Sequence, residues 1–115
     1  MSLINHAKDI IQGKARLGQK RSKDWKKTRQ AHLKEEPKCA VCGGNKKLEV
    51  HHIIPFNLDP SFELCSDNLI TLCENKKYGV NCHLLFGHLG KYSDWNPDCL
   101  QDVENWHVKI NKKSL

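Results

Sequence analysis

Long hydrophobic runs are missing from this 115-residue chain, and no stretch approaches the ~20 apolar residues that a membrane span needs. Hydrophobic residues make up only 38% of it and aromatic residues 7%, against about 45–50% apolar residues in an average soluble domain. Residues 1–9 carry charge where a signal peptide needs an apolar stretch, so we expect a cytoplasmic protein. The length fits one domain, and the small apolar supply indicates that something besides a hydrophobic core stabilises it.

Positive charge is concentrated in the first half of the chain. The formal net charge is +6, but residues 1–50 hold 13 Lys and Arg against 5 Asp and Glu, whereas residues 51–115 hold 6 against 8. The excess is densest at 14–34, with nine basic residues against Asp24 alone. Such density suits a polyanion such as nucleic acid, although a solvated helix face or a basic arm would give the same pattern.

Helical patterns occur at both ends of the sequence. Apolar spacing predicts a short amphipathic helix over 3–11, and a second helix is expected over 22–33, with Ser22 as its cap. A third helix is expected over 97–110, because Asn-Pro-Asp at 96–98 combines a cap, a first-turn proline and a first-turn acid.

Six cysteines are present, and two of them form the pair Cys39-x-x-Cys42. This spacing, followed by two glycines, is typical of a zinc knuckle. Cys73 and Cys82 supply a second pair, separated by a polar, turn-rich insert that can loop out. Four thiolates around Zn²⁺ would stabilise a chain with a small core. Cys65 is an alternative to Cys73.

Cys99 is interpreted as a packed residue of the third helix. Six buried thiols without a metal are the plainer alternative, which the Cys-x-x-Cys pair disfavours.

Seven histidines are present, and two of them are adjacent in a predicted strand that begins at Leu48 and is stopped by Pro55. Neighbours on a strand point to opposite faces, so one buried face cannot explain both His51 and His52. A polar loop then leads to a returning strand over 68–73, and a short helix is expected from Cys82 to His88. Three other histidines are expected at the surface, namely His6, His32 and His107.

This combination resembles the HNH endonuclease family over about residues 38–89. It is carried by Cys39-x-x-Cys42, Val50-His51-His52-Ile53-Ile54-Pro55, Asn68-Leu69-Ile70-Thr71-Leu72-Cys73 and Cys82-His83. The resemblance implies an α+β fold, in which a ββα-metal core with a four-cysteine zinc knuckle is flanked by N-terminal and C-terminal helices. The compact size and the extended insert are most similar to small bacteriophage-type or prophage HNH proteins.

A single HNH endonuclease domain over 1–115 follows from this resemblance. Residues 1–37 would form a basic helical arm, residues 38–89 the zinc and ββα-metal core, and residues 90–115 the C-terminal helix.

The resemblance also implies roles for individual residues. His52 corresponds to the general base and His51 to a ligand of the catalytic metal, although the two roles could be exchanged. Asn68 corresponds to the residue that tethers the loop and orients the base. His83, directly after the last zinc cysteine, corresponds to a further metal ligand.

His88 is the remaining candidate, as a metal ligand or a phosphate contact. It follows His83 by five residues rather than four, so an α-helix would not place the two side chains on one face unless Gly87 bends the chain.

The chemistry of these residues suits phosphodiester hydrolysis. Imidazole titrates near neutral pH and can deprotonate water, while a divalent ion stabilises the charge that develops on the phosphate. We therefore expect a structural Zn²⁺ and one catalytic Mn²⁺, Mg²⁺, Ni²⁺ or Co²⁺. The partner is DNA, with no membrane and no small-molecule substrate, and the resemblance implies products with a 5′-phosphate and a 3′-hydroxyl.

Two functions from different classes remain open at this stage. One is a metal-dependent DNA endonuclease, and the other is a non-catalytic, zinc-stabilised nucleic-acid-binding module. The zinc knuckle and the basic residues suit both, but a pure binding module has no need of His51, His52, Asn68 and His83. A zinc-dependent protein-interaction module explains the basic half poorly.

Overall fold

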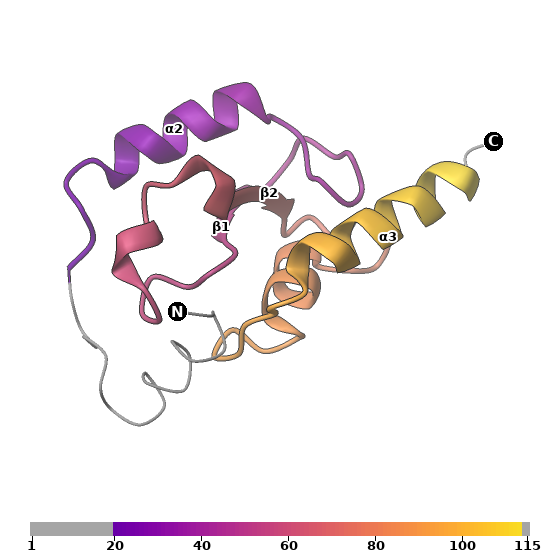
Figure 1. Cartoon of the computed structure of the whole chain (residues 1–115). Helices are drawn as coiled ribbons and strands as arrows, with labels where there is room; N and C mark the ends of the chain where they lie inside the picture. The colour runs from indigo at the N-terminus through magenta and orange to yellow at the C-terminus, as the bar shows by residue number, and fades with distance from the viewer. Residues whose placement is uncertain (1–19, 114–115) are drawn as a thin grey trace.

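The computed structural model describes residues 20–113, and the helix expected at 3–11 lies outside that range. Helices α2 (Trp25–Glu35) and α3 (Cys99–Lys113) flank a hairpin of β1 (Leu48–His52) and β2 (Leu69–Cys73), which leads into a short helical turn, η3 (His83–Gly87) (Figure 1). Two 3₁₀ turns lie between the strands: η1 (Pro60–Phe62) and η2 (Ser66–Asn68). This ββα arrangement with flanking helices confirms the predicted fold class.

Helix α2 packs against the hairpin. It begins three residues later than predicted, because Ser22 forms a separate turn in which its hydroxyl accepts from the Asp24 amide at 3.1 Å. At its other end the Glu36 carbonyl accepts from Thr71 Oγ1 at 2.8 Å, which ties the helix to β2. The predicted surface position of His32 is wrong: this side chain lies on the helix face that covers the hairpin, is 9% exposed, and places Nε2 2.7 Å from Glu36 Oε2.

The hairpin is antiparallel, with Leu48 opposite Cys73 and His52 opposite Leu69. Strand β1 is three residues shorter than the predicted strand, which ran to Pro55. Its continuation leaves the backbone ladder, since the amide of Ile54 donates to the Asn68 side chain at 2.7 Å instead. The two adjacent histidines therefore stand at the very end of β1, where the chain turns away from the sheet.

Helix α3 packs against η3 and closes the core from the other side (Figure 1). Asn96 lies in the turn just before it, where its side-chain oxygen accepts from the Asp98 amide at 2.9 Å, so the predicted cap stands three residues ahead of the first helical residue. The helix begins at Cys99 and runs to Lys113, two residues later and three residues further than predicted. No helix in the described range 20–113 is long and apolar enough to cross a membrane.

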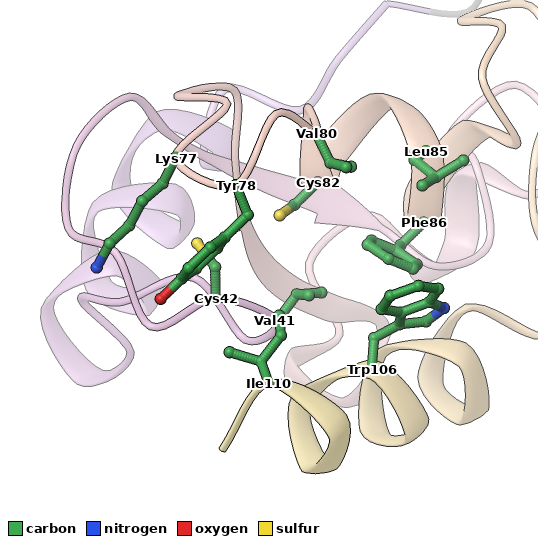
Figure 2. A pocket seen from close by; sticks show the side chains of 10 residues that line it. All are labelled: Val41, Cys42, Lys77, Tyr78, Val80, Cys82, Leu85, Phe86, Trp106 and Ile110. Carbon is green, nitrogen blue, oxygen red and sulfur yellow. The ribbon is translucent and has the colours of Figure 1, made fainter. Parts of the chain in front are cut away.

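The buried core joins both strands, η3 and α3 around four of the cysteines. Leu72 of β2 is fully buried in it, and Val103 of α3 packs on the same cluster. A neighbouring cavity of about 380 Å³ is bordered by the rings of Phe86 and Trp106, whose centroids are 5.8 Å apart. Figure 2 shows α3 presenting Trp106 and Ile110 toward this cavity.

Candidate metal centres and active site

The structure brings together the four cysteines predicted to bind zinc. One sulfur from each of Cys39, Cys42, Cys73 and Cys82 lies within 4.8 Å of the others, and all four residues are buried. The first pair sits in a tight turn, in which the Cys39 amide donates to the Gly44 carbonyl at 2.7 Å. The second pair comes from the end of β2 and the residue before η3, so the polar insert loops out between them as predicted.

The four thiols of this cluster need a cation among them in order to ionise together. A hydrogen bond from Cys82 lowers the pKa of the Cys39 thiol to about 4, while burial raises the pKa of Cys42 to about 11. Four thiolates this close repel one another, so they ionise together only with a cation among them. Four buried sulfurs in a closed cluster fit a structural zinc ion.

The remaining two cysteines lie outside this cluster. Cys65 is exposed, so the alternative in which it replaces Cys73 is wrong. Cys99 is fully buried at the start of α3, where burial raises its thiol pKa to about 11. It packs as a small apolar residue, as predicted.

A second cluster consists of His51, His83 and His88. One ring nitrogen from each lies within 4.8 Å of the others, and the Nε2 atoms of His83 and His88 are 3.2 Å apart. Burial, followed by the two neighbouring imidazoles, lowers the pKa of His51 to about 3. Burial also lowers the pKa of His88. His51 and His88 are thus neutral near pH 7, the form in which histidine binds a metal.

The π-helical form of η3 explains how His88 reaches this cluster. A π-turn bonds residue i to residue i+5, so side chains five apart stack on one face. The turn also needs Gly87, since a Cβ there would lie 2.8 Å from Cε1 of the His51 ring. Asn96, three residues before α3, supports the turn by donating from Nδ2 to the Phe86 carbonyl at 2.9 Å. We predicted that a bend at Gly87 would bring His83 and His88 onto one face. In the structure the wider π-turn of η3 does this instead.

Hydrogen bonds on the far side of two of these rings orient their Nε2 atoms toward the cluster. Nδ1 of His83 lies 3.1 Å from Glu74 Oε2, and Nδ1 of His88 lies 2.8 Å from the Asp94 carbonyl. Both acceptors favour the tautomer with hydrogen on Nδ1, which leaves Nε2 free as a ligand atom. Tyr92 hydroxyl donates to the same Glu74 oxygen at 2.5 Å, and this contact, with that of His83, lowers the pKa of Glu74.

The other member of the strand pair, His52, faces a different set of neighbours. Its Nε2 lies 3.0 Å from the Glu63 carbonyl, and its ring lies 4.4 Å from that of Trp25 between ring centroids. Donation to that carbonyl places the hydrogen on Nε2 and leaves Nδ1 as the unprotonated, accepting nitrogen. Burial lowers the pKa of His52, although the hydrogen bond to Glu63 opposes the effect.

Arg21 is the hydrogen-bond donor to this nitrogen. Its Nη1 is 3.3 Å from His52 Nδ1, and its guanidinium lies over the Phe56 ring at 4.7 Å from the centroid. The buried Glu63 side chain fixes the segment that leads into α2, because one of its oxygens accepts from the Ser22 amide at 3.0 Å. Arg21 is part of the predicted basic segment, but nothing in the sequence distinguishes it from the other basic residues there.

Asn68 holds the loop that follows β1. Its Nδ2 donates to the carbonyls of Ile54 at 3.1 Å and Phe62 at 3.2 Å, in addition to the bond its oxygen accepts from the Ile54 amide. The residue is 5% exposed and bonds to the backbone at Ile54 and at Phe62, the residue directly before Glu63. It therefore fixes the backbone that contacts His52.

One cavity of about 280 Å³ joins the two histidine environments. Because β1 ends at His52, both members of the strand pair border this cavity although their rings face different neighbours. Its lining includes Arg21, His51, His52, His83, His88 and Tyr92. A basic side chain, a base candidate and the histidine cluster thus open onto one space.

The arrangement of the histidine cluster fits a divalent metal. Within the described residues, Nε2 of His51 is buried without a hydrogen-bond partner, and an unpaired buried polar atom is costly unless a ligand satisfies it. Three imidazoles with open space beside them match the donor preference of Mn²⁺, Co²⁺, Ni²⁺ and Zn²⁺.

Comparison with known families agrees with this geometry. The family model described as HNH endonuclease matches residues 39–85, a segment that contains the four cysteines, both strands and His83. This match confirms the resemblance found in the sequence and associates the segment with metal-binding, nuclease-type activity on nucleic acid. No curated protein and no solved structure is significantly similar to the chain.

Sequence reasoning missed Glu74 and Tyr92. The sequence places Glu74 in a polar insert, although its position directly after Cys73 brings it beside the cysteine and histidine clusters. No motif or spacing in the sequence pointed to Tyr92 as a site residue, because its contact with Glu74 spans 18 residues and depends on the chain reversal after η3.

Proposed function

We propose that the protein is a metal-dependent DNA endonuclease that hydrolyses phosphodiester bonds. The observation that carries the proposal is the shared cavity: three converging imidazoles and Nδ1 of His52 border one space, which lies largely within the matched segment. A zinc-stabilised binding module would have no use for a buried His51 whose Nε2 lacks a partner.

In this proposal His52 is the general base. Donation of its Nε2 hydrogen to the Glu63 carbonyl leaves Nδ1 to accept a proton from the attacking water. Asn68 positions the loop that supplies this carbonyl. A base of this kind contributes about 10²–10⁴-fold to the rate.

His51, His83 and His88 would hold the catalytic ion, and Cys39, Cys42, Cys73 and Cys82 would hold a structural Zn²⁺. The catalytic ion supplies positive charge for the phosphate and the leaving oxygen. Mn²⁺, Co²⁺ and Ni²⁺ suit these nitrogen ligands, and Mg²⁺ suits the phosphate oxygens that would complete its coordination.

Arg21 is the phosphate contact nearest to the base. Its guanidinium lies against His52 Nδ1 in the absence of DNA, and a phosphate in the cavity would draw it away, because a charged phosphate is a stronger acceptor than an imidazole. The base would then be free when substrate is bound. Together with the exposed lysines of α2, this contact supports a proposal in which DNA lies across the face formed by α2 and the end of β1, and in which residues 1–115 act as one nuclease domain.

Cleavage of supercoiled plasmid in the presence of Mn²⁺ tests the proposal. We expect conversion to nicked or linear product by the wild type and loss of at least about 100-fold in His52→Ala. The Glu104→Gln variant, an exposed change on α3, is the matched control and should cleave normally. DNA binding without cleavage under any of the four divalent ions would instead support the binding module.

A further inference from the structure

Glu74 and Tyr92 form a hydrogen-bonded chain that ends on a candidate metal ligand. The Tyr92 hydroxyl donates to Glu74 Oε2 at 2.5 Å, and the same oxygen accepts from His83 Nδ1 at 3.1 Å. The ring of Tyr92 also lies against both histidines, 5.7 Å from His83 and 5.2 Å from His88 between centroids. A carboxylate and a phenol thus support the histidine cluster from its outer side.

The chain of contacts is anchored at both ends. Asn81 Nδ2 lies 3.3 Å from the Tyr92 hydroxyl, and Asn81 Oδ1 accepts from the Leu84 amide at 2.9 Å at the start of η3. The Glu74 amide donates to the Lys47 carbonyl at 2.9 Å, which fixes the backbone just beyond β2. Glu74 is therefore held in place rather than free to sample solvent.

Glu74 and His83 each directly follow a cysteine of the buried cluster. Cys73 precedes Glu74 and Cys82 precedes His83, so closing the four sulfurs into one cluster also places the carboxylate beside the imidazole. A carboxylate on the outer nitrogen of a ligating histidine fixes its tautomer and makes the ring a better donor to a metal.

We propose that Glu74 and Tyr92 are positioning residues of the histidine cluster: Tyr92 holds Glu74, and Glu74 orients His83 for metal binding. This inference deepens the proposed function and rests on it for the identity of the ligand site. Neither residue touches the reacting phosphate in this role, since both act through His83.

The test measures Mn²⁺ and Ni²⁺ affinity by calorimetry on full-length, zinc-loaded protein without DNA. Glu74→Ala is expected to weaken binding about 10–100-fold, the usual effect of removing such a partner. Glu74→Gln keeps a neutral acceptor, so its metal affinity should lie between those of Glu74→Ala and the wild type. Tyr92→Phe should weaken binding by a smaller factor, and the Glu74→Ala/Tyr92→Phe double variant should match Glu74→Ala alone.

A second readout separates positioning from a structural role. This readout uses protein with zinc at the cysteine cluster and no added Mn²⁺ or Ni²⁺. Imidazole nitrogen chemical shifts in NMR should then show the hydrogen on Nδ1 of His83 in the wild type and a mixture of tautomers in Glu74→Ala. Zinc content and Tm should stay close to wild type in every Glu74 and Tyr92 variant, and Glu104→Gln is the matched control.

Several results would overturn the inference. Glu74→Ala with unchanged affinity would remove Glu74 from the site. Weak binding in Glu74→Ala together with normal binding in Tyr92→Phe would overturn the role of Tyr92, and an unchanged His83 tautomer in Glu74→Ala would overturn the orientation of His83 by Glu74. Loss of zinc in Glu74→Ala would make its role structural. His83→Ala tests the underlying proposal separately, since retained Mn²⁺ and Ni²⁺ binding there would dismiss the histidine cluster as the metal site.

Discussion

His83 and His88 face each other with their Nε2 atoms 3.2 Å apart, although five residues separate them in the chain. An α-helix would direct these side chains roughly 140° apart around its axis. The π-turn of η3 brings them onto one side, and π-turns of this kind occur often at functional sites. The i, i+5 spacing is thus compatible with a shared ligand site only because of this local geometry.

Gly87→Ala should disturb this site. The added Cβ would lie 2.8 Å from His51 Cε1, and overpacking of a buried group costs about 1–3 kcal/mol. We expect weaker Mn²⁺ binding and a lower Tm, measured by calorimetry and thermal denaturation. Leu85→Ala is a control in the same turn, because Leu85 borders the other cavity and is 41% exposed. Wild-type metal affinity in Gly87→Ala would contradict the packing argument.

Cys42→Ser should lose zinc and much of the stability. Three ligands hold zinc poorly, and the core is too small to compensate. A loss of only about 2 kcal/mol would lower Tm by roughly 10 °C in a domain of this size. Elemental analysis and thermal denaturation measure both effects. The control is Cys65→Ser, whose exposed thiol should change neither; full zinc content in Cys42→Ser would dismiss Cys42 as a ligand.

Substitutions of the two adjacent histidines should separate base from ligand. His52→Ala should retain Mn²⁺ and DNA but lose cleavage by about 100-fold or more. His51→Ala should weaken Mn²⁺ binding, with partial recovery of cleavage in excess Mn²⁺, and His51→Asp should be milder because a carboxylate also binds the ion. Calorimetry and plasmid cleavage provide the measurements. If His52→Ala loses the metal while His51→Ala keeps it, the roles are exchanged.

The pH dependence of cleavage should follow the neutral form of His52. Burial lowers its pKa below the ordinary 6.5, so the base stays unprotonated down to a lower pH than a free imidazole would. We expect the acid limb of kcat/KM to have its midpoint below pH 6.5 and a plateau above it. Metal occupancy must be measured at each pH, because protonation also removes ligands. An acid limb centred above pH 6.5 at full metal occupancy would contradict this expectation.

DNA binding should depend on salt through the exposed lysines of α2. Each phosphate contact contributes about 0.9 to the slope of log K against log salt. Lys26→Ala/Lys27→Ala should therefore flatten the slope by up to about 2, and removal of residues 1–20 should flatten it as well, with zinc content unchanged. Fluorescence anisotropy measures the slope. The control is Lys76→Ala/Lys77→Ala, which removes equal charge from the exposed insert; an equal effect there would make the contribution of α2 non-specific.

The sequence predicted the hairpin, the four clustered cysteines and α3 because each has a local signal: a strand-forming run stopped by Pro55, Cys-x-x-Cys spacing, and Asn-Pro-Asp. It could not predict what depends on long-range packing. The burial of His32 follows from how α2 lies on the hairpin, and the ends of both helices shifted by two or three residues where turns compete with helix.

The same limit applies to the site. Residue types, spacing and the resemblance to HNH endonucleases together nominated His51, His52, His83 and His88, but the i, i+5 geometry required a π-turn that no composition signal marks. Arg21 looked like any other basic residue until its contact with His52 was visible.

The polar insert between Cys73 and Cys82 also gives the molecule a place to accept foreign sequence. Both ends of the insert are fixed by the buried cysteine cluster, while Lys76 and Lys77 at its tip are exposed. Doubling the length of a flexible loop costs only about 0.6 kcal/mol in closure entropy. A reporter peptide or a DNA-recognition module spliced between these two lysines would therefore leave the cysteine and histidine clusters in place and, under the proposed function, offer a route to a nuclease with a chosen target.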